Sequence, residues 1–428
     1  MIYIKRIFIF LSSLKVAISL LFIIALSSAI GTAIPQEDER INYLNNYTDT
    51  PWLGIINGEA ILKLQLDHVY SSYWFLTLLA WLTIALIVCS WRRQLPSLRS
   101  AIKWLHYDKP EQISKLAISK ILKSTNPSES INKLEVLLKK KGWQTEKKEN
   151  SLAARKGIVG RFGPPIVHFG LILLIFGATL GSIKGQKFEN FLVPGRSIDL
   201  ISPNQKNKLS FFLESFNIER SPEGQPEQFK SLLKIIDSAK ENPIYKEISV
   251  NHPLRYNGLT IYQADWSLAA ITIQIGNSPK LQLPLTSIPE LGEQVWGLIL
   301  PNIEDNNEQI LATISSEEGP LKVFNQEGEV LGFIRPKGKS ITVREKELNL
   351  YAVLASSGIL IKRDPGVPIV YIGFAITLLG GIMSIISTKF LWAISKEDGN
   401  SIYIGGKCNR DLTGFSKEFP KLIKPVLE

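Results

Sequence analysis

The four histidines are the side chains of this 428-residue chain best suited to chemistry near neutral pH, and one of them lies inside an apolar segment. His168 follows Gly163-Pro-Pro-Ile-Val and stands about four residues, or roughly 6 Å, inside a predicted membrane helix. An ionisable residue within a membrane span is a functional candidate, and neutral imidazole is a natural axial ligand of haem iron. The alternative is a histidine that hydrogen-bonds a neighbouring helix near the membrane interface.

The other histidines lie in polar segments. His68 follows Asp67 just before a predicted span, where it could contribute to a site at the outer end of that span or be an interfacial residue without a special role. His252 lies in a predicted turn between two strands, and a satisfied surface histidine is the alternative to a site residue there. His106 falls in a basic segment, and we expect it to be solvated.

The motifs of common enzymes are missing from the sequence. It has no Gly-x4-Gly-Lys-Ser/Thr loop, no His-Glu-x-x-His, no Cys-x-x-Cys and no Gly-x-Ser-x-Gly, which disfavours ATP hydrolysis and metal or covalent catalysis by the chain itself. Without Cys-x-x-Cys-His the chain is not a typical c-type cytochrome. Cys89 and Cys408 are too few for a disulfide framework, and we expect inert thiols. We predict no catalytic side chain.

Four windows have the length of membrane-spanning helices, which need roughly 20 apolar residues. They are 11–33, 71–91, 164–183 and 367–388, and the last three contain no Asp, Glu, Lys or Arg. The first window contains Lys15, close enough to its start to reach the interface. Lys5 and Arg6 before the first window also fit a cleavable signal peptide, but the apolar stretch is long for one, which favours a retained helix.

The net charge of +10 is concentrated in one loop. Residues 92–161 hold 17 basic and 6 acidic residues, a net charge of +11, whereas residues 31–70 carry −4 and residues 185–365 carry −3. Under the positive-inside rule the 92–161 loop and both termini are cytoplasmic, and the 185–365 region lies on the opposite side. Orientation in the membrane explains the positive charge, so we expect no nucleic acid partner.

The segments between the spans differ in predicted structure. In the basic loop, Asn126-Pro-Ser-Glu129 predicts a helix start, and 143–147 and 152–156 are predicted to be short strands. Residues 113–121 carry apolar side chains at helical spacing, which predicts a basic amphipathic helix that lies on the membrane or packs on the loop domain. Region 185–365 has alternating or β-branched runs between Gly, Pro and Asn, which predicts a large β-rich domain.

Small residues mark expected helix contacts and a hinge. The third span carries Gly177-x3-Gly181-x3-Gly185, and the fourth carries Gly373, Gly380, Gly381 and Ser384. Such spacing lets helices approach closely, either within this chain or against a partner subunit. Gly157, Gly160 and Gly163, just before the third span, suggest a flexible hinge at the membrane surface.

Four parts of the chain together resemble a known family. They are 67–75 with the Cys89-Ser90-Trp91-Arg92-Arg93 end of the second span, Gly160-Arg161-Phe162-Gly163-Pro164 before His168, 251–254 with 258–264, and the last span after Asp364-Pro365-Gly366 with Gly405-Gly406-Lys407. They occur in order along nearly the whole chain. On them the sequence resembles the ResB/CcsB family of System II cytochrome c biogenesis, in its cyanobacterial and plastid branch.

The resemblance implies a function and partners. Members act with a CcsA (ResC)-type haem-handling membrane protein to bring haem across the membrane and attach it to apocytochrome c on the lumenal or periplasmic side. His168 matches a histidine that the family uses to ligate haem b in transit, with a second iron ligand from CcsA; His68 and His252 are lesser cofactor-binding candidates. The resemblance also implies half of a synthase, contact with membrane lipid, and a thylakoid location with the large domain in the lumen.

Two alternatives stand beside haem delivery. The chain could be a scaffold that recruits apocytochrome while all haem ligands lie in CcsA, or a four-helix sensor or transporter subunit unrelated to haem. The expected fold class is an integral membrane α-helical protein with a large β-rich extracytoplasmic domain and a small basic cytoplasmic α/β domain. The expected parts are a first helix within 1–33, a lumenal loop 34–70, a helix 71–91, the basic loop domain 92–163, a helix 164–184, the β-rich domain 185–366, a helix 367–388 and a cytoplasmic tail 389–428.

Overall fold

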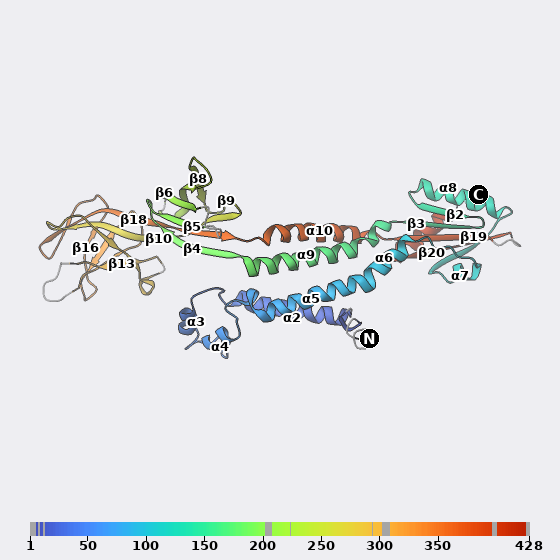
Figure 1. Ribbon diagram of the computed structural model, residues 1–428, viewed down its shortest axis with the longest axis horizontal. Coiled ribbons are helices and arrows are strands. Elements are labelled where there is room, and N and C mark those ends of the chain that lie inside the picture. The colour runs from blue at the N-terminus through green and yellow to red at the C-terminus, as the bar shows by residue number, and fades with distance from the viewer. Residues whose placement is uncertain are drawn as a thin grey trace. The chain divides into compact units, whose positions relative to one another are not determined.

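The computed structural model divides the chain into two compact units, residues 1–184 with 365–428 and residues 185–364 (Figure 1). The structure describes residues 6, 9–11, 13–201, 208–222, 224–292, 294–301, 309–395 and 400–424. Lys5 of the predicted signal-like start therefore lies outside the described residues.

The first unit holds the predicted membrane helices. Its helices are α2 (Leu14–Ala33), α3 (Arg40–Asn46), α4 (Gly58–Lys63), α5 (Tyr73–Cys89), α6 (Leu95–Ile102), α7 (Pro110–Ser114), α8 (Pro127–Lys140), α9 (Gly163–Lys184), α10 (Val367–Ile385) and α11 (Leu412–Ile423), with 3₁₀ turns η1 (Val69–Ser71) and η3 (Ile158–Arg161) and a π-helical turn η2 (Ser90–Gln94). Four of these elements, α2, α5 with its continuation to Ile102, α9 and α10, are long and apolar enough to cross a membrane. The prediction of four apolar helices is confirmed.

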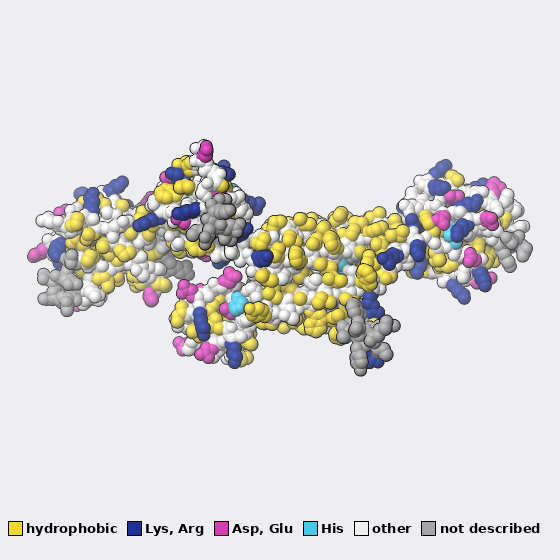
Figure 2. Space-filling model, in the orientation of Figure 1, with side chains coloured by type: hydrophobic (Ala, Val, Ile, Leu, Met, Phe, Trp, Pro, Cys, Tyr) yellow, Lys and Arg dark blue, Asp and Glu magenta, His cyan; other side chains and the backbone are white. Residues whose placement is uncertain are grey.

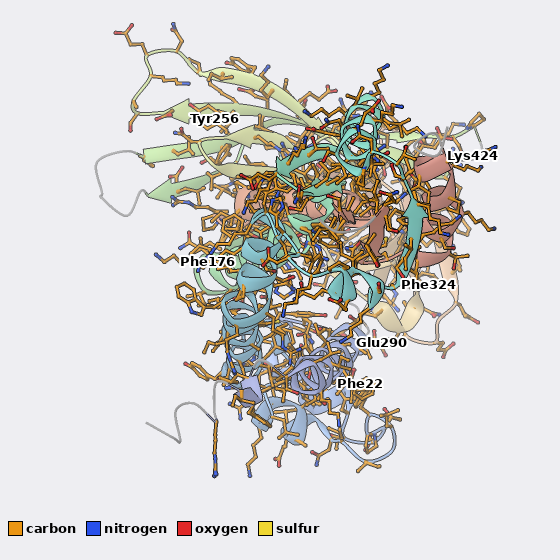
Figure 3. The ribbon with its side chains drawn as sticks, turned by 90° about the vertical axis from the view of Figure 1, so that its right-hand side faces the viewer. Phe22, Phe176, Tyr256, Glu290, Phe324 and Lys424 are labelled. Atoms are coloured by element: carbon orange, nitrogen blue, oxygen red, sulfur yellow. The ribbon has the colours of Figure 1, made fainter. Side chains whose placement is uncertain are left out.

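The four apolar helices bury little of their surface within this chain. Only 17%, 22%, 11% and 11% of their most apolar windows are buried, in chain order. Figure 2 shows hydrophobic side chains covering the helical region, and Phe22 on α2 and Phe176 on α9 point away from it (Figure 3). Exposed apolar surface of this extent needs lipid or another protein to cover it.

Helices α9 and α10 pack backbone against backbone. A Cβ atom added at Gly170 would lie 2.3 Å from Thr377 Oγ1 and 2.8 Å from the Gly373 carbonyl oxygen, and one added at Gly373 would lie 2.9 Å from the Gly170 carbonyl oxygen. The same close approach recurs at Gly163 and Gly177 on α9 and at Gly366 and Gly380 on α10. The contact is thus internal to the chain and repeats every seven residues. Of the glycines predicted for the contact, Gly381 faces open space.

We predict that Gly170→Val weakens the α9–α10 contact, because the new methyl groups must push the two backbones apart. Overpacking of this kind costs about 1–3 kcal/mol, so the midpoint of thermal unfolding in detergent should fall. Gly381→Val is the matched control, because nothing lies within 4 Å of a Cβ atom added at Gly381. An equal fall for both variants would contradict the contact.

Gly157, Gly160 and Gly163 have a packing role. Cβ atoms added at Gly157 and Gly160 would lie 2.2 and 1.9 Å from the carbonyl oxygens of Ser387 and Ile386, just beyond α10. The sequence suggested a hinge at these glycines. In the structure they instead pack closely against the end of α10.

A small helical cap lies at the amino-terminal end of α5. Helices α3 and α4 and turn η1 pack around Ile34, Tyr43, Ile61, Val69 and Phe75, all buried. Asn57 caps α4 and Ser72 caps α5 by accepting hydrogen bonds from the N–H groups of Ala60 and Phe75.

The segment between α5 and α9 and the tail after α10 form one domain, the loop–tail domain (residues 103–162 and 386–424). Its strands are β1 (Ile118–Lys123), β2 (Gln144–Lys148), β3 (Ser151–Lys156), β19 (Lys389–Ser395) and β20 (Ser401–Cys408), in the antiparallel order β1-β20-β19-β3-β2. Helices α8 and α11 cover one face, and α7 with Trp104 and Tyr107 packs on the other. The sequence treated loop and tail as separate segments; the sheet joins them.

The local predictions in this domain have mixed outcomes. The β2–β3 hairpin is confirmed, and so is α8, which Asn126 caps by accepting a hydrogen bond from Glu129 N–H. The amphipathic helix over 113–121 is wrong, because α7 ends at Ser114 and residues from Ile118 form β1 against β20. Pairing with a distant strand outweighs the local helical spacing.

The second unit confirms the prediction of a large β-rich domain. Its strands are β4 (Gln186–Leu192), β5 (Ser197–Ile201), β6 (Lys208–Arg220), β7 (Pro226–Asp237), β8 (Ile244–Ser249), β9 (Leu254–Tyr256), β10 (Leu259–Ile275), β11 (Leu281–Pro284), β12 (Thr286–Ser287), β13 (Trp296–Ile299), β14 (Leu311–Ile314), β15 (Leu321–Phe324), β16 (Val330–Ile334), β17 (Ile341–Val343) and β18 (Lys346–Arg363), with the 3₁₀ turn η4 (Pro289–Leu291). The long strands β10 and β18 pair along most of their length. One half packs on sheet β5–β8 and the other on sheet β12–β16, which gives two hydrophobic cores.

Candidate functional site

His168 faces the place where α5 departs from α-helical geometry. Helix α5 continues through the π-helical turn η2 into α6, and η2 begins at Ser90 and ends at Gln94. The His168 ring contacts both of these residues: Nδ1 lies 3.1 Å from Ser90 Oγ, and Nε2 lies 3.5 Å from Gln94 Nε2. π-Helical turns are rare and occur frequently at functional sites.

The α9–α10 contact sets the direction of the His168 side chain. His168 is two residues from Gly170, which places it roughly 200° around the helix axis at 3.6 residues per turn. Because Gly170 lies against α10, His168 points away from α10 and towards the end of α5. The ring is partly buried there.

The hydrogen bonds favour one of the two neutral forms of the His168 ring. The Ser90 hydroxyl donates its one proton to the Leu86 carbonyl oxygen at 2.8 Å, so it accepts from His168 at Nδ1. With the hydroxyl in this orientation, Nδ1 carries the hydrogen and the lone pair of the neutral ring lies on Nε2. This is the arrangement of a metal-binding histidine whose second nitrogen is held by a neighbouring group.

Nε2 is the nitrogen available to a ligand. The Gln94 amide can donate to it, but a separation of 3.5 Å is long for a hydrogen bond, and the contact is weak. A movement of the Gln94 side chain would expose the Nε2 lone pair to an iron ion. Among the described residues there is no group of three or more His, Cys, Asp or Glu that could hold a metal ion, so His168 offers a single ligand.

The structure separates His68 from His168. His68 precedes α5, where its Nδ1 lies 2.9 Å from Asp67 Oδ2, while His168 contacts the other end of α5, about 25 Å away along a helix of 17 residues. His252 belongs to the second unit, in the exposed turn between β8 and β9, with Nδ1 3.2 Å from the Val250 carbonyl oxygen.

The prediction of a solvated His106 is wrong. Its side chain is only 7% exposed and lies between Ser151 Oγ, 3.2 Å from Nδ1, and Glu146 Oε1, 3.0 Å from Nε2. Segment 104–107 packs on the sheet of the loop–tail domain. The basic sequence around it gave no sign of this burial. His106 is a structural residue of that domain.

Ser90 and Gln94 belong to the candidate site, although the sequence did not single them out. Ser90 lies within Cys89-Ser90-Trp91-Arg92-Arg93, one of the segments that carry the family resemblance, and this was the one sequence signal for it. No sequence signal pointed to Gln94. The π-helical turn that aims both side chains at His168 has no sequence signature that would have identified it.

Comparisons with known proteins identify the family of this chain. Residues 14–344 and 300–420 match the model of the ResB-like family. The chain is 53% identical over 426 residues to the cytochrome c biogenesis protein CcsB of Prochlorococcus marinus strain MIT 9303, covering 100% of this chain and 99% of the relative. It is 49% identical over 431 residues to the protein of the same name from Paulinella chromatophora, covering 99% of both.

Among solved structures, the chain is similar to the cytochrome c heme lyase CcmF at 10% identity and a TM-score of 0.26, over 76% of this chain and 42% of that one. Similarity at this level carries no argument. The family match and the full-length relatives do: this chain belongs to the ResB-like family.

Proposed function

We propose that this chain is a membrane subunit of cytochrome c biogenesis that supplies one iron ligand, His168, to haem b in transit. The observation that carries the proposal is the His168 ring, with Nδ1–H held by Ser90 and the Nε2 lone pair covered only by a long contact to Gln94. The names of the full-length relatives support the process, cytochrome c biogenesis. The second axial ligand and the thiols of apocytochrome c come from partners.

The shared sheet supports the proposed topology. Strands from the loop before α9 and from the tail after α10 pair with each other, so both segments lie on the same side of a membrane that α9 and α10 cross. The 92–161 loop carries the net charge of +11, which makes this side cytoplasmic under the positive-inside rule. The β-rich domain between α9 and α10 is then on the opposite side, which in a cyanobacterial thylakoid is the lumen.

The proposed division of labour follows from what the chain offers. One histidine supplies one axial ligand, and a CcsA-type partner supplies the other and covers part of the exposed helix surface. His168 lies near the cytoplasmic ends of α5 and α9, so it would act at the entry side of the path. Covalent attachment on the lumenal side needs proximity of reduced haem and thiols, which the β-rich domain would support by holding apocytochrome c or bracing the partner.

The first prediction of this proposal concerns His168 itself. The chain and its CcsA-type partner, purified together in detergent, should show a Soret band and a reduced α band. His168→Ala should lower the haem content at least about tenfold while the subunits still copurify, because the iron loses a ligand. Added imidazole should restore the bands. Unchanged haem content and spectrum in the variant would instead favour the scaffold, with all haem ligands in the partner.

The second prediction separates the two residues that contact His168. Ser90→Ala removes the group that holds Nδ1–H, and loss of such a supporting hydrogen bond lowers metal affinity about 10–100-fold. Gln94→Ala is the matched variant on the same π-helical turn. It should leave haem retention unchanged or increase it, because the Gln94 amide must leave Nε2 before iron binds. Haem-to-protein ratios after repeated detergent washes measure both, and equal losses would refute the assigned tautomer.

A further inference from the structure

A pocket in the loop–tail domain is lined by four cationic side chains and, in the described ranges, by no acidic one. It is a cavity of about 210 Å³, and its lining includes Lys103, Trp104, Arg155, Arg161, Trp392 and Lys407, from the segment after α6 and from β3, η3, β19 and β20. We call this the cationic pocket. The ion pairs of the domain join other residues, such as Lys389 with Glu418 and Lys139 with Glu135. None of the four pocket cations is in an ion pair among the described residues.

Arg161 is the strongest sign that the cationic pocket binds an anion. Its Nε is buried and has no hydrogen-bond partner within the described part of the chain. A buried donor without a partner is unfavourable, and more so on a cation. Burial, and then the nearby charge of Arg410, lower the pKa of Arg161, against a smaller opposing effect of Cys408. An acidic group in the pocket would supply it.

Arg155 is also positioned to bind an anion. Its guanidinium lies 4.0 Å from the centre of the Trp104 ring, Nε donates to Gln144 Oε1 at 2.9 Å, and Nη1 donates to the Ala101 carbonyl oxygen at 3.4 Å. All of these partners are uncharged, and the carboxylate of Glu146 acts on Arg155 only from beyond ion-pair distance. Stacking on an aromatic face and neutral hydrogen bonds orient an arginine while leaving its charge available to a carboxylate or phosphate.

The size of the pocket restricts the ligand. Pockets that enclose a drug-sized molecule have volumes of about 300–1,000 Å³, so a cavity of about 210 Å³ takes an acidic head group and leaves a larger body outside. The pocket lies beside the cytoplasmic end of the spans as proposed above, because α6 continues α5 and η3 precedes α9. An amphiphile fits this place, with acidic groups in the pocket and an apolar body against the helices.

The cationic pocket lies close to His168 along two elements. Arg161 is seven residues before His168, about 10 Å at 1.5 Å per residue. Ser97, which also lines the pocket, is three residues after Gln94, the residue that covers Nε2. Haem carries two propionate carboxylates on one edge of an apolar ring and iron at its centre. The same molecule thus offers carboxylates to the pocket and iron to His168.

We propose that the cationic pocket binds the propionate carboxylates of haem on the cytoplasmic side, with Arg161 and Lys407 as binding residues. This inference rests on the proposed function, because it takes haem as the cargo. The new element is that the carboxylates and the iron of haem are bound by different residues at the entry side. An anionic lipid head group shares the acidic chemistry and is the competing occupant.

The test compares three porphyrins on the full chain in nanodiscs of neutral phosphatidylcholine: haem, haem dimethyl ester and iron-free protoporphyrin IX. Quenching of tryptophan emission gives each dissociation constant. The parent chain should bind haem at least about tenfold more tightly than the ester, the change expected when a hydrogen bond to a charged group is lost. Arg161→Gln and, separately, Lys407→Gln should reduce this preference, while Lys120→Gln, which removes an exposed charge from the same domain, should keep it.

The comparison separates failure of the pocket from failure of the proposed function. His168→Ala should lose the preference for haem over protoporphyrin IX and keep the preference for acid over ester. If His168→Ala still prefers haem over protoporphyrin IX, iron ligation by His168 is contradicted and the pocket proposal is unaffected. Equal binding of acid and ester by the parent, or no quenching by either, would overturn the pocket proposal. The pocket proposal would also be overturned by a competing lipid. In that case phosphatidylglycerol copurifies with the parent but not with Arg161→Gln, and it abolishes the preference for acid over ester.

Discussion

The close backbone contact between α9 and α10 is the constraint on which the first unit depends. Where α9 begins and α10 ends, the contact passes directly into a strand pair: Thr388 Oγ1 donates to the Gly157 carbonyl oxygen at 3.0 Å, and Lys156 pairs with Lys389. The helical hairpin thereby sets the register of β3 against β19. Two segments more than 200 residues apart in sequence become neighbours, and the loop–tail domain forms around them.

The same contact orients the candidate site. With the glycine face of α9 against α10, His168 has one direction open, towards α5. Helix α5 meets it with a π-helical turn that presents Ser90 to Nδ1 and Gln94 to Nε2. A regular α-helix would also place residues four apart on one face, but the wider turn changes where that face points. The geometry of the histidine thus depends on three helices and one local irregularity.

Much of this architecture was predictable from sequence, for physical reasons. Apolar runs that must cross about 30 Å of hydrocarbon are long and almost uncharged, so the four helices were plain. The β2–β3 hairpin and the start of α8 rest on local turn and capping chemistry, and both predictions are confirmed. β1 was mistaken for helix because its burial comes from β20, whose sequence lies about 280 residues away. His106, Ser90 and Gln94 depend on tertiary contacts that no local pattern encodes.

A single histidine on the proposed haem path has to satisfy two opposing requirements. Before cargo arrives, its ring must be oriented and its lone pair must not be fixed by a strong bond. Ser90 meets the first requirement through a hydroxyl anchored to the Leu86 carbonyl. Gln94 meets the second, because an amide donor 3.5 Å from Nε2 covers the lone pair through a bond that is weak at that distance. Moving Gln94 away from Nε2 therefore costs little free energy. The free energy gained from binding iron and the carboxylates then contributes almost fully to haem affinity.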